Sequence, residues 1–242
     1  MASPDSAARL EGEIELALAV GGRPFEVIAG APAARYGARI TFRPSGDPCQ
    51  LAAAFGLERH PWGVPSWIGV RVLAAGVRRK AYHKLNRLDD RFALPTNLPD
   101  DFYPVMASLD GDATEVYLRA RSPRPWDSFA AICTAPLGGS KVSFAPRPRP
   151  AAHAFCLSFR WCNELLTAVS LYADYHALPD EQTTRAAWIA GMTESDAYAY
   201  EMALIGVRSL GQLRRGASHA MLAWTLEDNG DWHRAVSLRM PD

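Results

Sequence analysis

The chain has 242 residues, enough for one large domain with a sizeable core, and its 48% hydrophobic and 21% charged content is that of an ordinary globular protein. Lysine plus arginine and aspartate plus glutamate both count 26, so the net charge is zero, and neither a nucleic acid nor a membrane is expected as a partner. We expect a single domain over residues 1–242, with a flexible tail over residues 1–10.

Segments that alternate apolar and polar residues predict strands, and they come in pairs. Before the first pair, EIELALAV (13–20) alternates as a strand does, although its composition also suits a helix. Turn signals lie at Asp110-Gly111, at Cys162 to Glu164 and at Asn229-Gly230, of which the last is the strongest. The five predicted pairs are 24–30 with 38–44, 66–76 with 77–85, 103–121, 154–175 and 219–241.

Helical segments lie between these pairs. The first, over residues 47–60, opens with Asp47 as a cap and Pro48 at the first helical position. Three more are expected over 124–139, 180–192 and 193–216. Tight strand pairs exclude parallel βαβ units, and about ten strands are enough to close a wide barrel. The predicted fold is an α/β (α+β) antiparallel barrel of ten strands, built from five hairpin–helix repeats with the helices outside.

Three of the predicted strands carry basic and aromatic residues at alternate positions, and therefore on one face. A pocket of arginine, lysine and tyrosine suits a phosphorylated or diphosphate ligand, because arginine makes bidentate contacts and lysine supplies a point charge. Each residue taken singly is better explained as a solvent-facing residue of a half-exposed strand. Taken together they fit the inner face of a barrel: Lys80, Tyr82 and Lys84; Arg39, Thr41 and Arg43; Tyr117, Arg119 and Arg121.

Short motifs give the chain a family resemblance. Pro24-Phe25-Glu26 is followed by a strand that begins at Arg39 and ends at Pro44, and Lys80-Ala81-Tyr82 stands in the second pair. In this order the motifs resemble those of aromatic prenyltransferases of the dimethylallyltryptophan synthase type. That family has a ten-stranded antiparallel barrel with outer helices, the prenyltransferase barrel or ABBA fold. The five hairpin–helix units match this layout along nearly the whole chain.

The resemblance implies roles for the matching residues. Glu26 would accept the indole N–H of the aromatic substrate, and Arg39 and Lys80 would bind the diphosphate leaving group. Tyrosines would shield the allylic cation from water. Enzymes of this type need no metal for ionisation, so no cofactor is required, although Mg²⁺ is compatible with the chemistry. The implied shielding residues are Tyr82, Tyr117 and Tyr172.

The sequence departs from the family pattern in the later repeats. Where the family has Arg-x-Lys-x-Tyr, this chain has Ala113, Glu115 and Tyr117, and where it has Lys-x-Tyr, this chain has Ser170 and Tyr172. Half of the expected diphosphate clamp is thus missing, and a carboxylate has entered the substrate-binding set. The cations that can compensate are Lys84, Arg43, Arg119 and Arg121.

Three functions therefore remain open. The first is prenyl transfer from an allylic diphosphate to an indole or related aromatic natural-product intermediate. The second is other chemistry on an aromatic metabolite, such as cyclisation, isomerisation or condensation, with Glu26 or Glu115 as acid or base. The third is a non-catalytic barrel that binds a small molecule. In each case the partner is a small molecule, and the chain is a monomer or a homodimer.

Other sequence signals indicate the compartment and the absence of a metal. The first residues lack the basic segment of a signal peptide, and no run approaches the ~20 apolar residues that cross a bilayer. The four cysteines form no CxxC pair and no cluster with zinc-ligand spacing, which favours buried free thiols in a reducing compartment. We therefore expect a cytoplasmic protein with no metal site.

Overall fold

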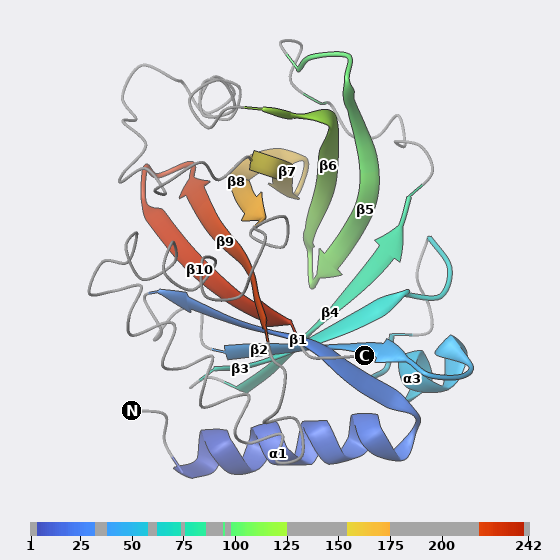
Figure 1. Cartoon of the computed structure of the whole chain (residues 1–242). Coiled ribbons are helices and arrows are strands. Elements are labelled where there is room, and N and C mark those ends of the chain that lie inside the picture. Colours follow the sequence, from blue (N-terminus) through green and yellow to red (C-terminus); the bar gives the residue numbers. More distant parts are fainter. Residues whose placement is uncertain are drawn as a thin grey trace.

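Antiparallel strands follow one another around a closed barrel in a computed structural model of the chain (Figure 1). The structure describes residues 4–31, 38–57, 62–73, 76–85, 94, 98–124, 154–174 and 218–239. Each strand pairs with its neighbours in sequence, and pairing of β1 with β10 closes the ring. The predicted antiparallel barrel is confirmed. Its strands are β1 (Gly22–Ala31), β2 (Ala38–Pro44), β3 (Trp67–Leu73), β4 (Gly76–Lys84), β5 (Phe102–Asp110), β6 (Ala113–Arg124), β7 (Ala154–Cys162), β8 (Leu165–Asp174), β9 (Ser218–Glu227) and β10 (Trp232–Arg239).

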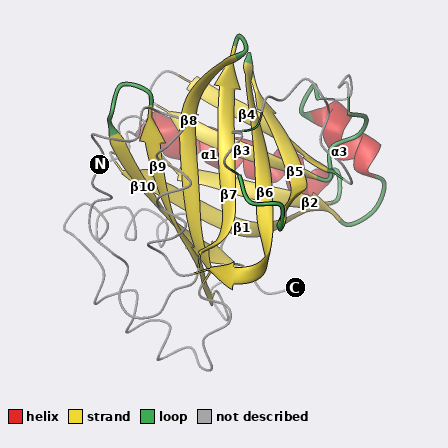
Figure 2. Ribbon diagram, turned by 90° about the horizontal axis from the view of Figure 1, so that it is seen from above, coloured by secondary structure: helices red, strands yellow, loops and turns green. Residues whose placement is uncertain are grey.

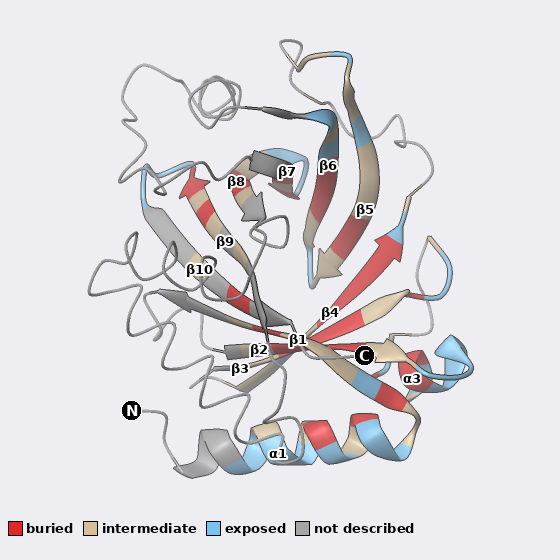
Figure 3. Cartoon of the chain, in the orientation of Figure 1, coloured by how far each residue is buried: buried red, intermediate tan, exposed pale blue. Residues whose placement is uncertain are grey.

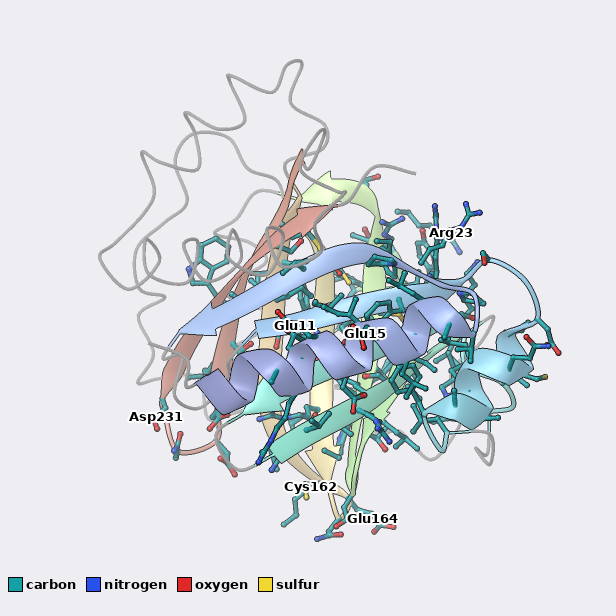
Figure 4. All side chains as sticks on the ribbon, turned by 90° about the horizontal axis from the view of Figure 1, so that it is seen from below. Glu11, Glu15, Arg23, Cys162, Glu164 and Asp231 are labelled. Carbon is teal, nitrogen blue, oxygen red and sulfur yellow. The ribbon has the colours of Figure 1, made fainter. Side chains whose placement is uncertain are left out.

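The hairpin turns form where the sequence predicts them. Asn163 and Glu164 both have positive φ, of 49° and 67°, which is the backbone that a two-residue turn between twisted strands requires. In the last hairpin, the Asn229 side chain accepts a hydrogen bond from the Asp231 backbone N–H at 2.9 Å. Figure 4 shows Cys162, Glu164 and Asp231, which lie in or next to the hairpin turns, far from Arg23 near the start of β1.

Helix α1 (Pro4–Ala19) lies across the outside of the barrel and contacts β1 and β3 (Figures 1 and 2). It settles the ambiguous segment 13–20 as helical, except for its last residue, because Ile14 and Ala17 are buried on one stripe. Glu11 and Glu15, labelled in Figure 4, are exposed. Residues 4–10, expected to belong to a flexible tail, form the start of this helix.

Helix α3 (Pro48–Ala54) begins as predicted, because the Asp47 side chain accepts a hydrogen bond from the Cys49 backbone N–H at 2.9 Å. It ends earlier than residue 60, since Gly56 turns the chain with φ of 67°. The helices expected over 124–139, 180–192 and 193–216 lie, apart from residue 124 in β6, outside the described residues. Within the described ranges, no helix is long and apolar enough to cross a membrane.

The two faces of the sheet differ in chemistry. The outer face is apolar, and its largest buried members include Ile40, Phe42 and Phe159. Figure 3 marks in red the buried stretches of the strands, which include residues of both faces. On the outer face of β4, Arg79 forms an ion pair with Glu13 of α1 at 2.8 Å. Its neighbour Lys80 must therefore face the barrel interior, because successive side chains of a strand point to opposite faces.

The cysteines are only partly as expected. Cys156 is buried, whereas Cys49 is exposed and Cys162 is half-buried. The prediction of buried thiols is thus correct for Cys156 and wrong for Cys49, which lies in the first turn of α3 rather than in the core.

Candidate functional site

A buried carboxylate, Glu115 of β6, is the centre of the polar network inside the barrel. Its Oε2 atom accepts hydrogen bonds from Lys80 Nζ at 2.5 Å and from the Tyr117 hydroxyl at 2.8 Å. Its Oε1 atom accepts hydrogen bonds from the Ser158 hydroxyl at 2.5 Å and the Tyr172 hydroxyl at 3.2 Å. Four strands, β4, β6, β7 and β8, thus supply one network, and the side chains reach across intervening strands over the inner face.

The Lys80–Glu115 pair is charged at neutral pH. Burial would raise the pKa of Glu115, but the Lys80 ammonium and the Ser158 hydroxyl outweigh it and lower the pKa to about 2. Burial lowers the pKa of Lys80 to about 8, against the opposing attraction of Glu115. Glu115 is therefore a weak proton acceptor, and the candidate acid–base role expected for it is not favoured by its surroundings.

An aromatic wall lies beside this pair. The rings of Tyr82 and Tyr117 are 6.2 Å apart, and those of Tyr117 and Tyr172 are 5.9 Å apart. The Lys80 ammonium lies 5.3 Å from the Tyr82 ring centre and 5.7 Å from that of Tyr117. Both distances are within the range of cation–π attraction, so this wall already holds one cation. Burial raises the pKa of all three tyrosine hydroxyls, which keeps them protonated.

Arg39 of β2 lies against the same wall. Its guanidinium carbon is 5.5 Å from the centre of the Tyr82 ring. Gly69 of β3 leaves room for this contact, since a Cβ there would come within 3.0 Å of Arg39 Cδ and 3.1 Å of Tyr82 Cε2. Burial would lower the pKa of Arg39, but Tyr82, Tyr117 and Glu26 outweigh it and raise that pKa. Arg39 is therefore a permanent cation inside the barrel.

Several buried polar atoms on this side of the interior have no hydrogen-bond partner among the described residues. They belong to β2, β4 and β5, strands that are close together in the ring. Buried polar groups of native proteins are nearly always satisfied, so unsatisfied ones that face a common space indicate a missing partner. The atoms are Arg39 Nε, Thr41 Oγ1, Tyr82 Oη and Ser108 Oγ.

The carboxylate expected to act on the substrate, Glu26, lies on β1 and is half-buried. The Ser237 hydroxyl of β10 donates a hydrogen bond to Glu26 Oε1 at 2.7 Å. In the barrel register Glu26 stands opposite Thr41 of β2, two residues from Arg39. Glu26 is also one of the charges that raise the pKa of Arg39, which brings the two candidates into one electrostatic group.

The structure thus brings together seven of the expected site residues in the interior: Glu26, Arg39, Lys80, Tyr82, Glu115, Tyr117 and Tyr172. The compensating cations lie apart from the Glu115 network. Lys84 is exposed, and its ammonium lies 5.4 Å from the centre of the Trp67 ring. Arg43 is half-buried and pairs with Arg23 of β1. Arg119 is exposed and pairs with Cys156 of β7. Among the described residues no group of histidine, cysteine or acidic side chains has the arrangement of a metal site.

Several interior residues were not expected from the sequence, among them Ser158 and Arg71. Ser158 completes the Glu115 network, and a lone serine in a strand gives no signal of such a role. Arg71 of β3 stands opposite Arg39 on one side and Arg78 on the other. Arg71 could have been found from the sequence, because the hairpin of residues 66–85 pairs it with Arg78 around the turn at Gly76.

No protein-family model matches this sequence, and no curated protein matches it either. Solved structures do match the fold. PriB, in a binary complex with the product diphosphate, aligns with a TM-score of 0.63 and 15% identity over 98% of this chain and 90% of PriB. A 6-dimethylallyl tryptophan synthase aligns with a TM-score of 0.57 and 15% identity, over 96% of this chain and 93% of the synthase. The 5-dimethylallyl tryptophan synthase of Streptomyces coelicolor, in complex with DMASPP and Trp, aligns with a TM-score of 0.53 and 13% identity. The alignment covers 89% of this chain and 78% of the synthase.

These matches extend over nearly the whole chain, and they agree with the motif resemblance in the sequence. At such low identity they establish the architecture. The chain has the prenyltransferase-barrel fold of the dimethylallyltryptophan synthases.

Proposed function

We propose that this chain transfers a prenyl group from an allylic diphosphate to an indole or related aromatic intermediate. The observation that carries the proposal is a set of buried atoms at the tyrosine wall that have no hydrogen-bond partner in the described part of the chain, namely Arg39 Nε, Thr41 Oγ1, Tyr82 Oη and Ser108 Oγ. A ligand with several hydrogen-bonding oxygens and an apolar tail would satisfy these atoms and pack on the rings. Structures of the same fold hold a diphosphate, or DMASPP together with Trp, which supports this ligand class.

The proposed reaction distributes roles as follows. The C–O bond of the allylic diphosphate breaks, and its electron pair leaves with the diphosphate, whose growing charge Arg39 stabilises. A ring carbon of the acceptor attacks the allylic carbon, and tyrosine faces shelter the positive charge from water. The attacked ring then loses its proton. Glu26 binds the indole N–H, which makes the ring more electron-rich, and its half-buried carboxylate is better suited than Glu115 to accept a proton.

The test is direct turnover. The chain is incubated with dimethylallyl or geranyl diphosphate and a panel of indoles, with and without Mg²⁺, while diphosphate release and product mass are followed. We expect a prenylated product, and a loss of at least 100-fold in kcat for Glu26→Gln, as for other positioned proton-transfer groups. Glu15→Gln, an exposed glutamate on α1, serves as the matched control and should keep full activity. A folded chain that releases no diphosphate with any acceptor would exclude prenyl transfer.

A second function is favoured by the Lys80–Glu115 pair, since a lysine bonded to a buried carboxylate at 2.5 Å is not available to a leaving diphosphate. In this alternative the barrel acts on an aromatic metabolite without prenyl transfer, with Glu26 as acid or base. Such an enzyme would convert an aromatic substrate with no diphosphate present, and its activity would also fall in Glu26→Gln. A purely binding barrel would take up the ligand saturably and form no product.

A further inference from the structure

The hydrogen-bonding capacity of Glu115 is fully used within the chain. A carboxylate offers about four acceptor positions, and Glu115 fills four with Lys80, Tyr117, Ser158 and Tyr172. Two of the three N–H donors of Lys80 are also in use, because its ammonium donates to Glu115 Oε2 and to Tyr117 Oη, the latter at 3.1 Å. Any anionic group that approached Lys80 would meet the negative charge of Glu115 in a poorly hydrated interior, where like charges repel strongly.

A different group of cations lies on the neighbouring wall. Arg39, Arg71 and Arg78 stand directly opposite one another on β2, β3 and β4, on the same face of the sheet. Arg39 and Arg71 are half-buried, and Arg78 is exposed at the outer end of this row. Like charges directly opposite on adjacent strands are destabilising unless a counter-charge is present. Burial and the Arg39 charge both lower the pKa of Arg71, which is further sign of a crowded cationic row.

Within the described ranges, acidic side chains offset only part of this positive charge. Glu26 attracts Arg39, and Asp110 and Glu115 attract Arg71 through space. Arg39 Nε nevertheless has no hydrogen-bond partner among the described residues, although the atom is buried. The absence of a side chain at Gly69, between Arg39 and Tyr82, keeps open the space over which this guanidinium extends.

We propose that Glu115 is a built-in counter-ion that withholds Lys80 from the ligand, and that the ligand's anionic group binds instead to Arg39 and Arg71, with Arg78 at the rim. The inference deepens the proposed function and rests on it only for the identity of the ligand, a diphosphate ester. Adjacent strands are about 4.8 Å apart, so two neighbouring arginines suit two linked phosphoryl groups better than one. Removing Glu115 should release Lys80 and add a third cation to the site.

Calorimetric titration of the full chain with inorganic diphosphate tests this arrangement. Arg39→Gln and Arg71→Gln should each weaken binding at least tenfold, the size of one lost charge-assisted hydrogen bond. Arg23→Gln removes an equal charge from an exposed position at the start of β1, and should change the dissociation constant by less than threefold. Inorganic phosphate should bind at least tenfold more weakly than diphosphate, and equal binding of the two would overturn the paired-arginine site.

The role of Glu115 is tested in the same assay. Glu115→Gln should tighten diphosphate binding about tenfold, because Lys80 becomes available. The paired variant Lys80→Met with Glu115→Gln removes both charges and should bind within threefold of the original chain. A tenfold loss in the paired variant would show that Lys80 contacts the anion, and the proposal would be wrong. The proposal would also be wrong if Arg71→Gln bound diphosphate as tightly as Arg23→Gln does, or if the folded chain bound no diphosphate.

Circular dichroism and thermal melting check that each variant folds. If Arg71→Gln does not fold, Arg71→Lys keeps the charge while removing the bidentate geometry, and should weaken binding three- to tenfold. Unchanged binding in Arg71→Lys would count against the site. The outcome is separable from the proposed function: diphosphate can bind the arginine row in a chain that makes no prenylated product. A chain that prenylates normally in Arg71→Gln would retain the function and refute the inference.

Discussion

Replacing Lys80 by methionine is the sharpest test of the buried ion pair. Methionine has a volume similar to that of lysine but no charge. The Glu115 carboxylate would stay buried, and only the hydroxyls of Tyr117, Ser158 and Tyr172 would still donate hydrogen bonds to it. Lys80 is 8% exposed and Glu115 is 7% exposed, so breaking this pair should cost about 3–5 kcal/mol of unfolding free energy. The sign agrees with the lowered pKa of Glu115, about 2 in the fold against an ordinary 4.5, since Lys80 is the main group that stabilises the ionised carboxylate.

Urea unfolding at pH 7, followed by tryptophan fluorescence, measures this cost. In the paired variant with Glu115→Gln, most of the loss should be recovered, because no uncompensated charge remains. Glu13→Gln breaks the half-exposed ion pair to Arg79 on the outer face of β4, and should cost about 1 kcal/mol or less. A Lys80→Met variant that loses less than about 1 kcal/mol, or a paired variant no more stable than Lys80→Met, would refute the argument.

The sign of the pH dependence follows from the lowered pKa of Glu115. A carboxyl whose pKa is lower in the folded state stabilises the fold above its unfolded pKa, and loses that contribution as the pH falls. For Glu115 the loss should occur between pH 4.5 and about 2. In Lys80→Met, burial should instead raise the pKa of Glu115. Protonation in acid would then remove the uncompensated buried charge and with it the loss of stability. The difference in stability between the two chains should therefore be largest near neutral pH and shrink in acid.

Two further predictions concern the tyrosine wall. Tyr82→Phe removes a buried hydroxyl that has no hydrogen-bond partner among the described residues, so the free energy of unfolding in urea should be unchanged or higher. Tyr117→Phe removes a hydrogen bond to Glu115, so it should lower the free energy of unfolding by about 1.5–3 kcal/mol. Gly69→Ala places a Cβ 3.0 Å from Arg39 Cδ, so it should displace Arg39 and weaken diphosphate binding severalfold at a stability cost of about 1–3 kcal/mol. Binding unchanged in Gly69→Ala would mean that Arg39 does not need its place beside Tyr82.

Local patterns in the sequence determine most of the barrel. Alternating side chains and turn residues such as Asn229-Gly230 are local signals, and each of the five hairpins forms where they indicate. The segment of residues 13–20 is different, because its pattern fits two structures. Burial of Ile14 and Ala17 against the barrel decides for a helix, and that contact depends on strands distant in the sequence.

The interior was predictable in part for a related reason. Alternation correctly places Lys80 and Tyr82 on one face, and the rings of Tyr117 and Tyr172 were expected beside them. The bond between Lys80 and Glu115 was not predictable, because the residues are 35 positions apart, on strands separated by β5. Which side chains meet across an intervening strand depends on the stagger of the closed sheet, and a single sequence does not specify that stagger.

The hydrogen bond from Ser237 to Glu26 spans 211 residues and joins the last strand to the first. It lies at the seam where β1 and β10 close the ring, so this hydrogen bond of the candidate base requires the final strand to pair with the first. This one bond therefore carries the entropic cost of bringing the two ends of the chain together, whereas the Glu115 network joins strands between β4 and β8. A chain shortened before β10 would lose the closing strand, leave the edges of β1 and β9 open to other molecules, and leave Glu26 without this bond.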